Sequence, residues 1–241
     1  MPISRFHEAQ PLAPGQTVDL SPETVQHIRA LRLESGAAVV LFNGDGQDYQ
    51  GELTLSGKKQ ATVAIKTEVA VESESPVAVR LGIGMSLGDR MEYAIQKATE
   101  LGVLSITPLA TERSELRLKG ERAEKKQARW QQVAISAAEQ CARARVPEVA
   151  PVQALADWLQ TVPLTDLRLV LHHEHATRLQ ELPPPTAITA LIGPEGGLSE
   201  QDLARAQAAG FTPVVLGPRV LRTETAPVAL LSAVQALWGD Y

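Results

Sequence analysis

The sequence lacks the features of secreted, membrane-spanning or disulfide-bonded proteins. Its single cysteine, Cys141, excludes an internal disulfide and, in a helical pattern among alanines, is expected to be a small core thiol. No run of about 18 apolar residues predicts a membrane helix. The first ten residues, with no basic stretch followed by an apolar one, are not typical of a secretory signal. We expect a cytoplasmic protein with no membrane partner.

Two common phosphate-binding motifs are also absent. The sequence contains no G-x-x-x-x-G-K-[ST] loop, and no G-x-G-x-x-G fingerprint stands at a junction between a predicted strand and helix. No Ser-His-Asp or Cys-His arrangement can be argued from spacing. A P-loop nucleotidase and a Rossmann dehydrogenase are therefore excluded.

The charged fraction of 21% is ordinary for a globular protein, but basic residues are concentrated in one segment. The net charge of -5 argues against a nucleic-acid partner, because phosphate binding depends on Lys and Arg. Residues 113–145, however, hold nine basic and four acidic side chains, a net of +5. This segment indicates an RNA-facing helix, or alternatively a solvated helix face with pairs such as Glu121 with Lys125.

Residues 1–72 predict a small β-barrel domain. The strands AAVVLFNG and QDYQGELTLSG flank the turn-forming run 43–46, and KKQATVAIKTEVAV follows another turn. One helix is expected after Ser21 as N-cap and Pro22 as its first residue. The run 72–76 has linker composition, so the second domain is expected to span residues 73–241.

Strands alternate with helices in residues 73–241, which predicts an α/β domain with a mainly parallel sheet. Strands are expected at 77–85, 105–111, 167–173, 188–193 and 213–217. Helices are expected at 90–101, 120–144 and 200–209. The last helix, VALLSAVQALW, is apolar nearly all round and must be covered by a deep core or by a partner subunit.

Two glycine-containing loops lie between a strand and a helix. Residues 192–199, IGPEGGLS, precede a helix capped by Ser199, and residues 216–226, LGPRVLRTETA, repeat the Gly-Pro start. Loops at neighbouring strand ends of a parallel sheet form one ligand crevice. Glycines expose backbone hydrogen-bonding groups, which suits a nucleoside-like ligand, while Arg219 and Arg222 suit a second, anionic ligand. Either loop taken alone is also compatible with an ordinary tight turn.

The run His172-His173-Glu174-His175 raises a metal hypothesis, because His and Glu bind zinc. On an extended strand only His173 and His175 would share a face, so a third ligand would have to come from elsewhere. The position at a strand end favours a wall of the ligand crevice instead. We expect no metal.

Five segments taken in order resemble the RsmE family, the uracil-N3 methyltransferases of 16S ribosomal RNA. They are LGDRMEYAIQKATELGV, TERSE, AAEQCARARVPEV, LIGPEGGLSEQDL and LGPRVLRTETA. The resemblance spans nearly the whole chain. It implies a SPOUT fold with a trefoil knot that binds S-adenosylmethionine, a PUA-like RNA-binding barrel at residues 1–72, and a homodimer packed at the knot.

The resemblance also implies roles for individual residues. The expected cofactor-binding residues are Leu171, His172, Gly193, Glu195, Gly197, Leu216, Gly217, Leu221, Arg222 and Thr223. The expected RNA-binding residues are Arg5, Arg90, Lys97, Arg113, Arg143 and Arg145. We expect Glu224 to be the general base and Arg222 to stabilise the uracil anion, with Glu195 as the competing base. The alternative role of Glu224 is a carboxylate at a helix N-terminus.

The expected substrate is 16S ribosomal RNA within an assembled or nearly assembled small subunit. We expect the homodimer to use Val228, Leu231, Val234 and Trp238. Two other functions stay open at this point: a ribosome-assembly factor that binds RNA without catalysis, and a metal-dependent hydrolase that uses His173 and His175.

Overall fold

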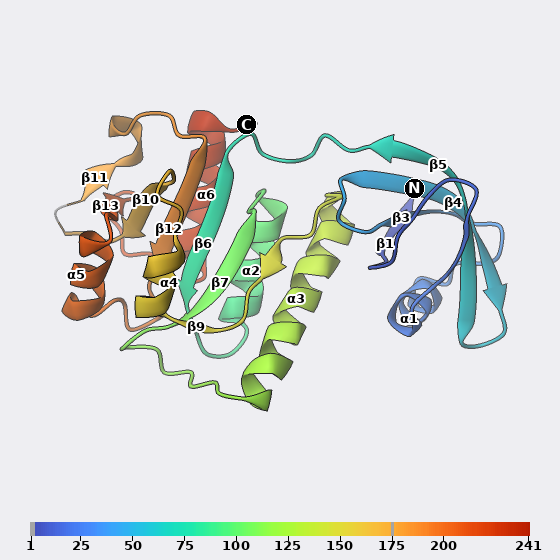
Figure 1. Cartoon of the computed structure of the whole chain (residues 1–241), viewed down its shortest axis with the longest axis horizontal. Coiled ribbons are helices and arrows are strands. Elements are labelled where there is room, and N and C mark those ends of the chain that lie inside the picture. The colour runs from blue at the N-terminus through green and yellow to red at the C-terminus, as the bar shows by residue number, and fades with distance from the viewer. Residues whose placement is uncertain (1–2, 175) are drawn as a thin grey trace. The chain divides into compact units, whose positions relative to one another are not determined.

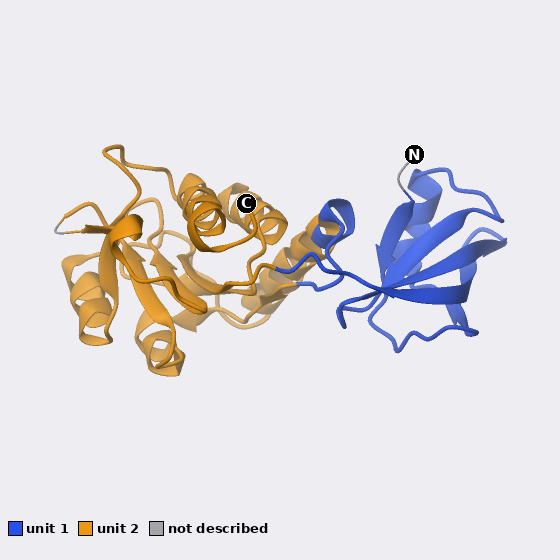
Figure 2. Ribbon diagram, turned by 90° about the horizontal axis from the view of Figure 1, so that it is seen from above, with its two compact units in different colours: residues 1–74, 138–146 blue, residues 75–137, 147–241 orange. Residues whose placement is uncertain are grey.

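The computed structural model describes residues 3–174 and 176–241, which form two compact units (Figure 1, Figure 2). Of the described residues, unit 1 contains 3–74 together with 138–146, and unit 2 contains 75–137, 147–174 and 176–241. The first division falls near the predicted linker. The return of residues 138–146 to unit 1 was not predicted.

Unit 1 is built on a mixed five-stranded sheet in the order β1-β3-β4-β5-β2. All neighbouring strands are antiparallel except β1 and β3. Its elements are β1 (Ser4–His7), β2 (Thr17–Asp19), α1 (Pro22–Ala30), β3 (Ala38–Phe42), β4 (Gln47–Ser56) and β5 (Gln60–Ala70). The predicted strands appear here as β3, β4 and β5, whereas β1 and β2 were missed because each is too short to show alternation.

Helix α1 begins where the sequence predicts it. The Ser21 hydroxyl accepts a hydrogen bond from the backbone N–H of Thr24 at 3.2 Å, and Pro22 occupies the first helical turn. Val25 and Ile28 are buried against the sheet core of unit 1. The cap and the buried face together explain why this short helix forms.

The segment that follows helix α3 (Glu121–Cys141) contributes a buried arginine to an ion pair of unit 1. The helix stops before the predicted end at Ala144, because Ala142 takes the left-handed conformation with φ 64°. Arg143, only 3% exposed, then donates to both carboxylate oxygens of Glu74, at 3.1 and 2.5 Å. The backbone oxygen of Arg143 accepts a hydrogen bond from Arg5, which also pairs with Asp48.

Unit 2 contains an eight-stranded sheet in which every strand pair is parallel, as predicted. The strand order is β11-β13-β10-β12-β6-β7-β8, with β9 also pairing with β7. The strands are β6 (Ala78–Gly84), β7 (Ser105–Ala110), β8 (Glu148–Val149), β9 (Gln153–Ala154), β10 (Leu167–Leu171), β11 (Thr177–Arg178), β12 (Ala187–Ile192) and β13 (Thr212–Val215).

Helices cover both faces of this sheet (Figure 1). The helices of unit 2, besides most of α3, are α2 (Arg90–Glu100), α4 (Leu155–Thr161), the 3₁₀ helix η1 (Leu179–Glu181), α5 (Glu200–Ala208) and α6 (Thr225–Trp238). Trp158 of α4 and Ala206 of α5 share one hydrophobic cluster with sheet residues, while α2 packs against α6. The sequence missed α4, whose seven residues are too few for a clear helical period.

The carboxyl-terminal segment crosses the sheet before it reaches α6. Residues 216–224 pass the ends of β10 and β12, where the Thr223 hydroxyl donates to the Gly193 carbonyl oxygen at 2.8 Å. Ala229 and Ala233 of α6 then line a cavity together with Leu179, which belongs to the connection between β10 and β12. This is the course expected of the SPOUT trefoil knot, although chains as a rule avoid such threading.

Helix α6 is covered mainly by its own chain. Leu230, Leu231 and Val234 are fully buried, so the apolar pattern of this helix reflects a deep core. The prediction that Leu231 and Val234 contact a partner subunit is therefore wrong as stated. Across the described ranges, no helix combines the length and apolarity needed to cross a membrane.

Candidate active site

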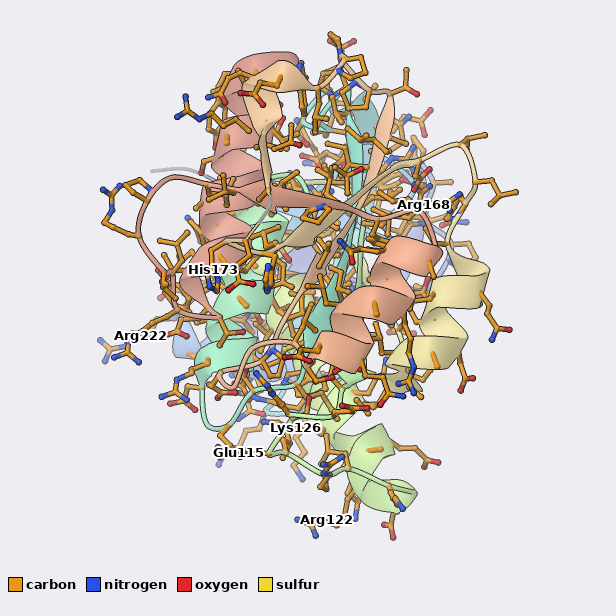
Figure 3. All side chains as sticks on the ribbon, turned by 90° about the vertical axis from the view of Figure 1, so that its left-hand side faces the viewer. Glu115, Arg122, Lys126, Arg168, His173 and Arg222 are labelled. Atoms are coloured by element: carbon orange, nitrogen blue, oxygen red, sulfur yellow. The ribbon has the colours of Figure 1, made fainter. Side chains whose placement is uncertain are left out.

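One cavity of about 520 Å³ lies at the carboxyl ends of β10, β12 and β13. Its lining includes both predicted glycine loops and the end of β10. Figure 3 looks onto this side of the molecule, where the labelled His173 and Arg222 mark two of its walls. Of the ten predicted cofactor-binding residues, the structure places nine in this lining: Leu171, His172, Gly193, Glu195, Gly197, Leu216, Leu221, Arg222 and Thr223.

Gly217 is the exception. It lines a second cavity of about 680 Å³, which also involves Leu179, Ala229 and Ala233. Its backbone has φ 110°, a conformation that side chains other than hydrogen rarely permit. Gly217 therefore shapes the turn out of β13 and contributes no wall to the first cavity.

The loop 193–197 owes its shape to local interactions. The N–H of Gly197 donates to the Pro194 carbonyl oxygen at 2.8 Å, which closes a tight turn, and Gly197 has φ 69°. Ser199 then caps α5 by accepting from the Asp202 N–H at 3.0 Å. The turn and the cap together direct the backbone of residues 193–197 toward the cavity.

A third segment, between β6 and α2, supports the two predicted loops and was missed from the sequence. A methyl group on Gly84 would lie 2.5 Å from the backbone nitrogen of Pro194, so the two backbone segments are in contact at this point. Ser86, only 2% exposed, donates to the Thr223 hydroxyl at 3.3 Å. Gly84 and Ser86 lie in a glycine- and serine-containing run, IGMSLGD, that carries no recognised motif.

Glu195 is firmly held. Its Oε1 accepts from the backbone N–H of Leu87 at 2.8 Å and from Arg90 Nη1 at 2.7 Å. Burial alone would raise the pKa of this carboxyl group. Hydrogen bonds from its own backbone N–H, from Arg90, Leu87 and Ser86 outweigh the burial and bring the pKa below its usual value. Glu195 is thus an ionised carboxylate with its Oε1 already occupied by donors.

Glu224 differs from Glu195 in its bonding. Its Oε2 is buried and accepts no hydrogen bond from any described residue. The nearest cation is Arg90, whose Nε lies 3.9 Å away. Although Glu224 is the N-cap residue of α6, its side chain makes no capping hydrogen bond. The structure thus shows a carboxylate at the cavity wall whose Oε2 lies beside a cation but accepts no hydrogen bond from the described residues.

The histidines at the end of β10 do not alternate as predicted. Because β10 ends at Leu171, His172 and His173 both line the cavity, with their rings stacked 4.9 Å apart. His172 Nδ1 accepts from the Glu174 N–H at 3.2 Å. His175, the other half of the predicted metal pair, lies outside the described residues. Elsewhere in the described chain, no three His, Cys, Asp or Glu side chains converge as metal ligands.

The six predicted RNA-binding residues occupy different environments. In unit 1, Arg145 is exposed, whereas Arg5 and Arg143 are held in the ion pairs described above. In unit 2, Arg113 is exposed and donates to the Gly196 carbonyl oxygen at 3.3 Å, and Lys97 pairs with Glu100. Arg90 lies at the cavity between two carboxylates.

Comparison with known proteins identifies the domains. Residues 73–235 match the family described as RNA methyltransferase domain, and residues 20–66 match the RNA methyltransferase PUA domain. Ribosomal RNA small subunit methyltransferase E from Bacillus subtilis is 32% identical, and the match covers 96% of each chain. The protein of that name from Buchnera aphidicola is 31% identical, over 99% of this chain and 98% of its own.

Two solved structures share the complete fold. That of ribosomal RNA small subunit methyltransferase E from Neisseria gonorrhoeae, bound to S-adenosyl methionine, is 40% identical with a TM-score of 0.94, and the match covers 99% of each chain. A putative methyltransferase from Legionella pneumophila, solved with the cofactor, is 38% identical with a TM-score of 0.96 over the whole of both chains. The chain belongs to the ribosomal RNA small subunit methyltransferase E family, as its loop motifs indicated.

Proposed function

We propose that this protein transfers a methyl group from S-adenosylmethionine to N3 of a uracil in small-subunit ribosomal RNA. Membership of the family makes the chain an S-adenosylmethionine-dependent ribosomal RNA methyltransferase. The uracil N3 target and the residues that act on it are the specific part of the proposal. A ribosomal substrate also supports a cytoplasmic location.

The residues of the cavity fit this cofactor. Leu171, Ile192, Leu216 and Leu221 give an apolar wall for a purine ring, and the loop backbones give hydrogen-bonding groups beside it. S-adenosylmethionine, when bound, supplies a methyl group that is already activated for transfer. The chain's own task is then to position the nucleophile and to remove its proton.

The free carboxylate oxygen of Glu224 is the observation that carries the uracil N3 proposal. Uracil N3 bears a proton and must lose it before or during attack. Glu224 lines the cavity, and its Oε2 accepts no hydrogen bond from the described residues, so no donor competes there with the N3 proton. Glu195, the competitor, already accepts two hydrogen bonds at Oε1 and has a lowered pKa, which makes it a weaker base.

Arg222 is the proposed stabiliser of the uracil anion. Its side chain is exposed at the rim of the cavity, while its backbone oxygen accepts the N–H groups of Thr225 and Ala226 at the start of α6. A helix start thus fixes the backbone and leaves the guanidinium group to face the substrate. A cation here would stabilise the negative charge that develops on the base.

The proposed RNA contacts combine Arg113 and Lys97 of unit 2 with Arg145 of unit 1. Helix α3 adds exposed basic side chains such as Arg122 and Lys125, although Lys125 also pairs with Glu121 at 2.6 Å. Phosphate contacts of this kind position RNA without selecting its sequence. An assembled or nearly assembled small subunit is the proposed substrate, because two RNA-binding surfaces on separate units suit a large structured RNA.

The chemical position of the product tests the proposal. Small ribosomal subunits lacking the modification, incubated with the protein and S-adenosylmethionine, are expected to gain one methyl group. A methyl at N3 removes the Watson–Crick donor of uracil, so reverse transcriptase should stop at that site, and nucleoside mass spectrometry should give 3-methyluridine. A methyl at C5 or on the ribose would contradict the N3 assignment, and no methylation would favour the RNA-binding assembly factor.

We also propose a homodimer that packs through the outer face of α6. Val228 and Trp238 stay partly exposed, Leu237 is 39% exposed, and Ala229 and Ala233 line the second cavity. These residues replace the buried Leu231 and Val234 of the sequence-based prediction. A partner on this face would cover apolar side chains that one chain leaves in contact with water.

Sedimentation tests the dimer. The protein is expected to sediment at twice the mass of the 25.9 kDa chain at micromolar concentration. Exchanging Leu237 for Asp places a charge in the proposed interface and should shift the equilibrium to monomer. Leu164→Asp, at a side chain 86% exposed outside that face, is the matched control. A native protein that sediments as a monomer at this concentration would contradict the proposal.

A further inference from the structure

Arg90 occupies an unfavourable position for a cation. It is the first residue of α2, where the helix dipole repels positive charge, and the N-cap residue Asp89 makes no side-chain capping bond. The side chain is 40% exposed, so a surface arginine there would ordinarily extend into water. Its actual partners lie in the cavity, which calls for a role in the site itself.

The guanidinium group of Arg90 joins two loops of the knot. Nη1 lies 2.7 Å from Glu195 Oε1 in the loop 193–197, and Nε lies 3.9 Å from Glu224 Oε2 in the loop that precedes α6. The same Oε1 of Glu195 accepts the Leu87 N–H at 2.8 Å. Two donors from the α2 side therefore fix one carboxylate, and the cation is shared between two carboxylates.

This arrangement leaves little of the Arg90 charge for RNA. The hydrogen bond to Glu195 raises the pKa of Arg90, with smaller contributions from the charges of Glu195, Glu224 and Glu115, so the environment of the guanidinium group is anionic. Arg90 was expected from the sequence to contact phosphate. A cation that is already shared between carboxylates displaces few counterions from the RNA phosphates, so it adds little to the affinity for RNA.

We propose that Arg90 is a positioning residue. It holds Glu195 at the wall of the cofactor cavity and places a positive charge beside Glu224. The role given to Glu224 rests on the proposed function, whereas the contact by which Arg90 holds Glu195 does not depend on it. Because the loop 193–197 is also fixed by Arg113, through the Gly196 carbonyl oxygen, loss of Arg90 should loosen one side of the loop and leave the other attached.

The test compares Arg90→Gln and Arg90→Lys with the parent. The carboxyl carbon of Glu195 can be followed by NMR in protein with ¹³C-labelled glutamate, and its signal is the one that disappears in Glu195→Gln. In Arg90→Gln this signal should titrate at higher pH than in the parent. The reason is that the Arg90 hydrogen bond is one of the interactions that lower the pKa of Glu195. Arg90→Lys should lower the pKa of Glu195 only part of the way back to the parent value, because the charge returns without the planar donor geometry. The kcat of Arg90→Gln should fall roughly tenfold to a hundredfold.

RNA binding gives the deciding control. The slope of log Kd against log salt should be the same for Arg90→Gln as for the parent, whereas Arg122→Gln on α3 should lower it by about 1. A slope lowered by about 1 in Arg90→Gln would overturn the proposal, and so would an unchanged Glu195 titration in folded Arg90→Gln. The titration and the salt slope need no methyl transfer, so they stay decisive even when the uracil N3 assignment fails.

Discussion

Replacing Glu224 by Gln is expected to lower kcat for RNA methylation by about 10² to 10⁴-fold. Glutamine keeps the shape of the side chain but cannot accept the N3 proton. The free Oε2 of Glu224 would be replaced by an amide group in the same buried place. The affinity for S-adenosylmethionine should change far less than kcat, because the apolar wall and the loop backbones remain. Single-turnover methylation and calorimetry measure the two quantities separately.

Glu200→Gln is the matched control for that variant. Glu200 is an exposed carboxylate in the first turn of α5, so the substitution removes the same charge near a helix start outside the cavity lining. It should methylate like the parent. Should Glu224→Gln bind the cofactor and also methylate at the parent rate, Glu224 is not the base.

Gly84→Ala is expected to weaken S-adenosylmethionine binding at least about a hundredfold, by roughly 3 kcal/mol. The added methyl would lie 2.5 Å from both the nitrogen and the Cδ of Pro194, and 3.1 Å from the carbonyl carbon of Gly193. These atoms belong to a backbone that no rotamer change can move. The loop 193–197 must shift away from β6, which displaces one wall of the cavity. Calorimetry with the cofactor checks the prediction.

Gly82→Ala separates loop displacement from general overpacking. A methyl on Gly82 would also approach a neighbour at 2.5 Å, but the neighbour is the ring of Trp158 in the core beneath the sheet. This variant should lower the melting temperature, since overpacking costs about 1 to 3 kcal/mol, with a much smaller effect on cofactor affinity. Equal losses of affinity in the two variants would show that the contact with Pro194 has no special role.

The sequence predicted the parts of the site that short motifs carry. The loop 192–199 was identified from Gly, Pro and a helix cap, and the loop 216–226 from the same Gly-Pro start between a strand and a helix. Their meeting follows from the rule for parallel strands. The residues it missed or assigned differently act over long separations. Arg90 meets Glu195 105 positions later, and Arg143 meets Glu74 69 positions earlier. No periodicity links such pairs, so a lone arginine in the sequence is easily assigned to RNA.

The fold was predictable to a similar extent. The strand and helix alternation of unit 2 and the cap at Ser21 are local, and both appear in the structure as expected. The knot is a property of the complete chain path, which no local pattern encodes. The final helix shows what a local pattern cannot predict. Its apolar pattern predicts that the helix is buried but not whether its own chain or a partner subunit buries it. In the structure the chain itself covers Leu231 and Val234.

The return of residues 138–146 to unit 1 affects how this protein can be divided for experiments. A fragment cut at the predicted boundary after residue 72 would lack both members of the Arg143–Glu74 pair. It would also lose the Glu139 carboxylate that accepts the backbone N–H of His7 at 2.9 Å, and the Arg143 carbonyl oxygen bound by Arg5. Unit 1 is therefore discontinuous in the sequence. An isolated version requires the peptide 138–146 to be joined to it, by a linker or by circular permutation.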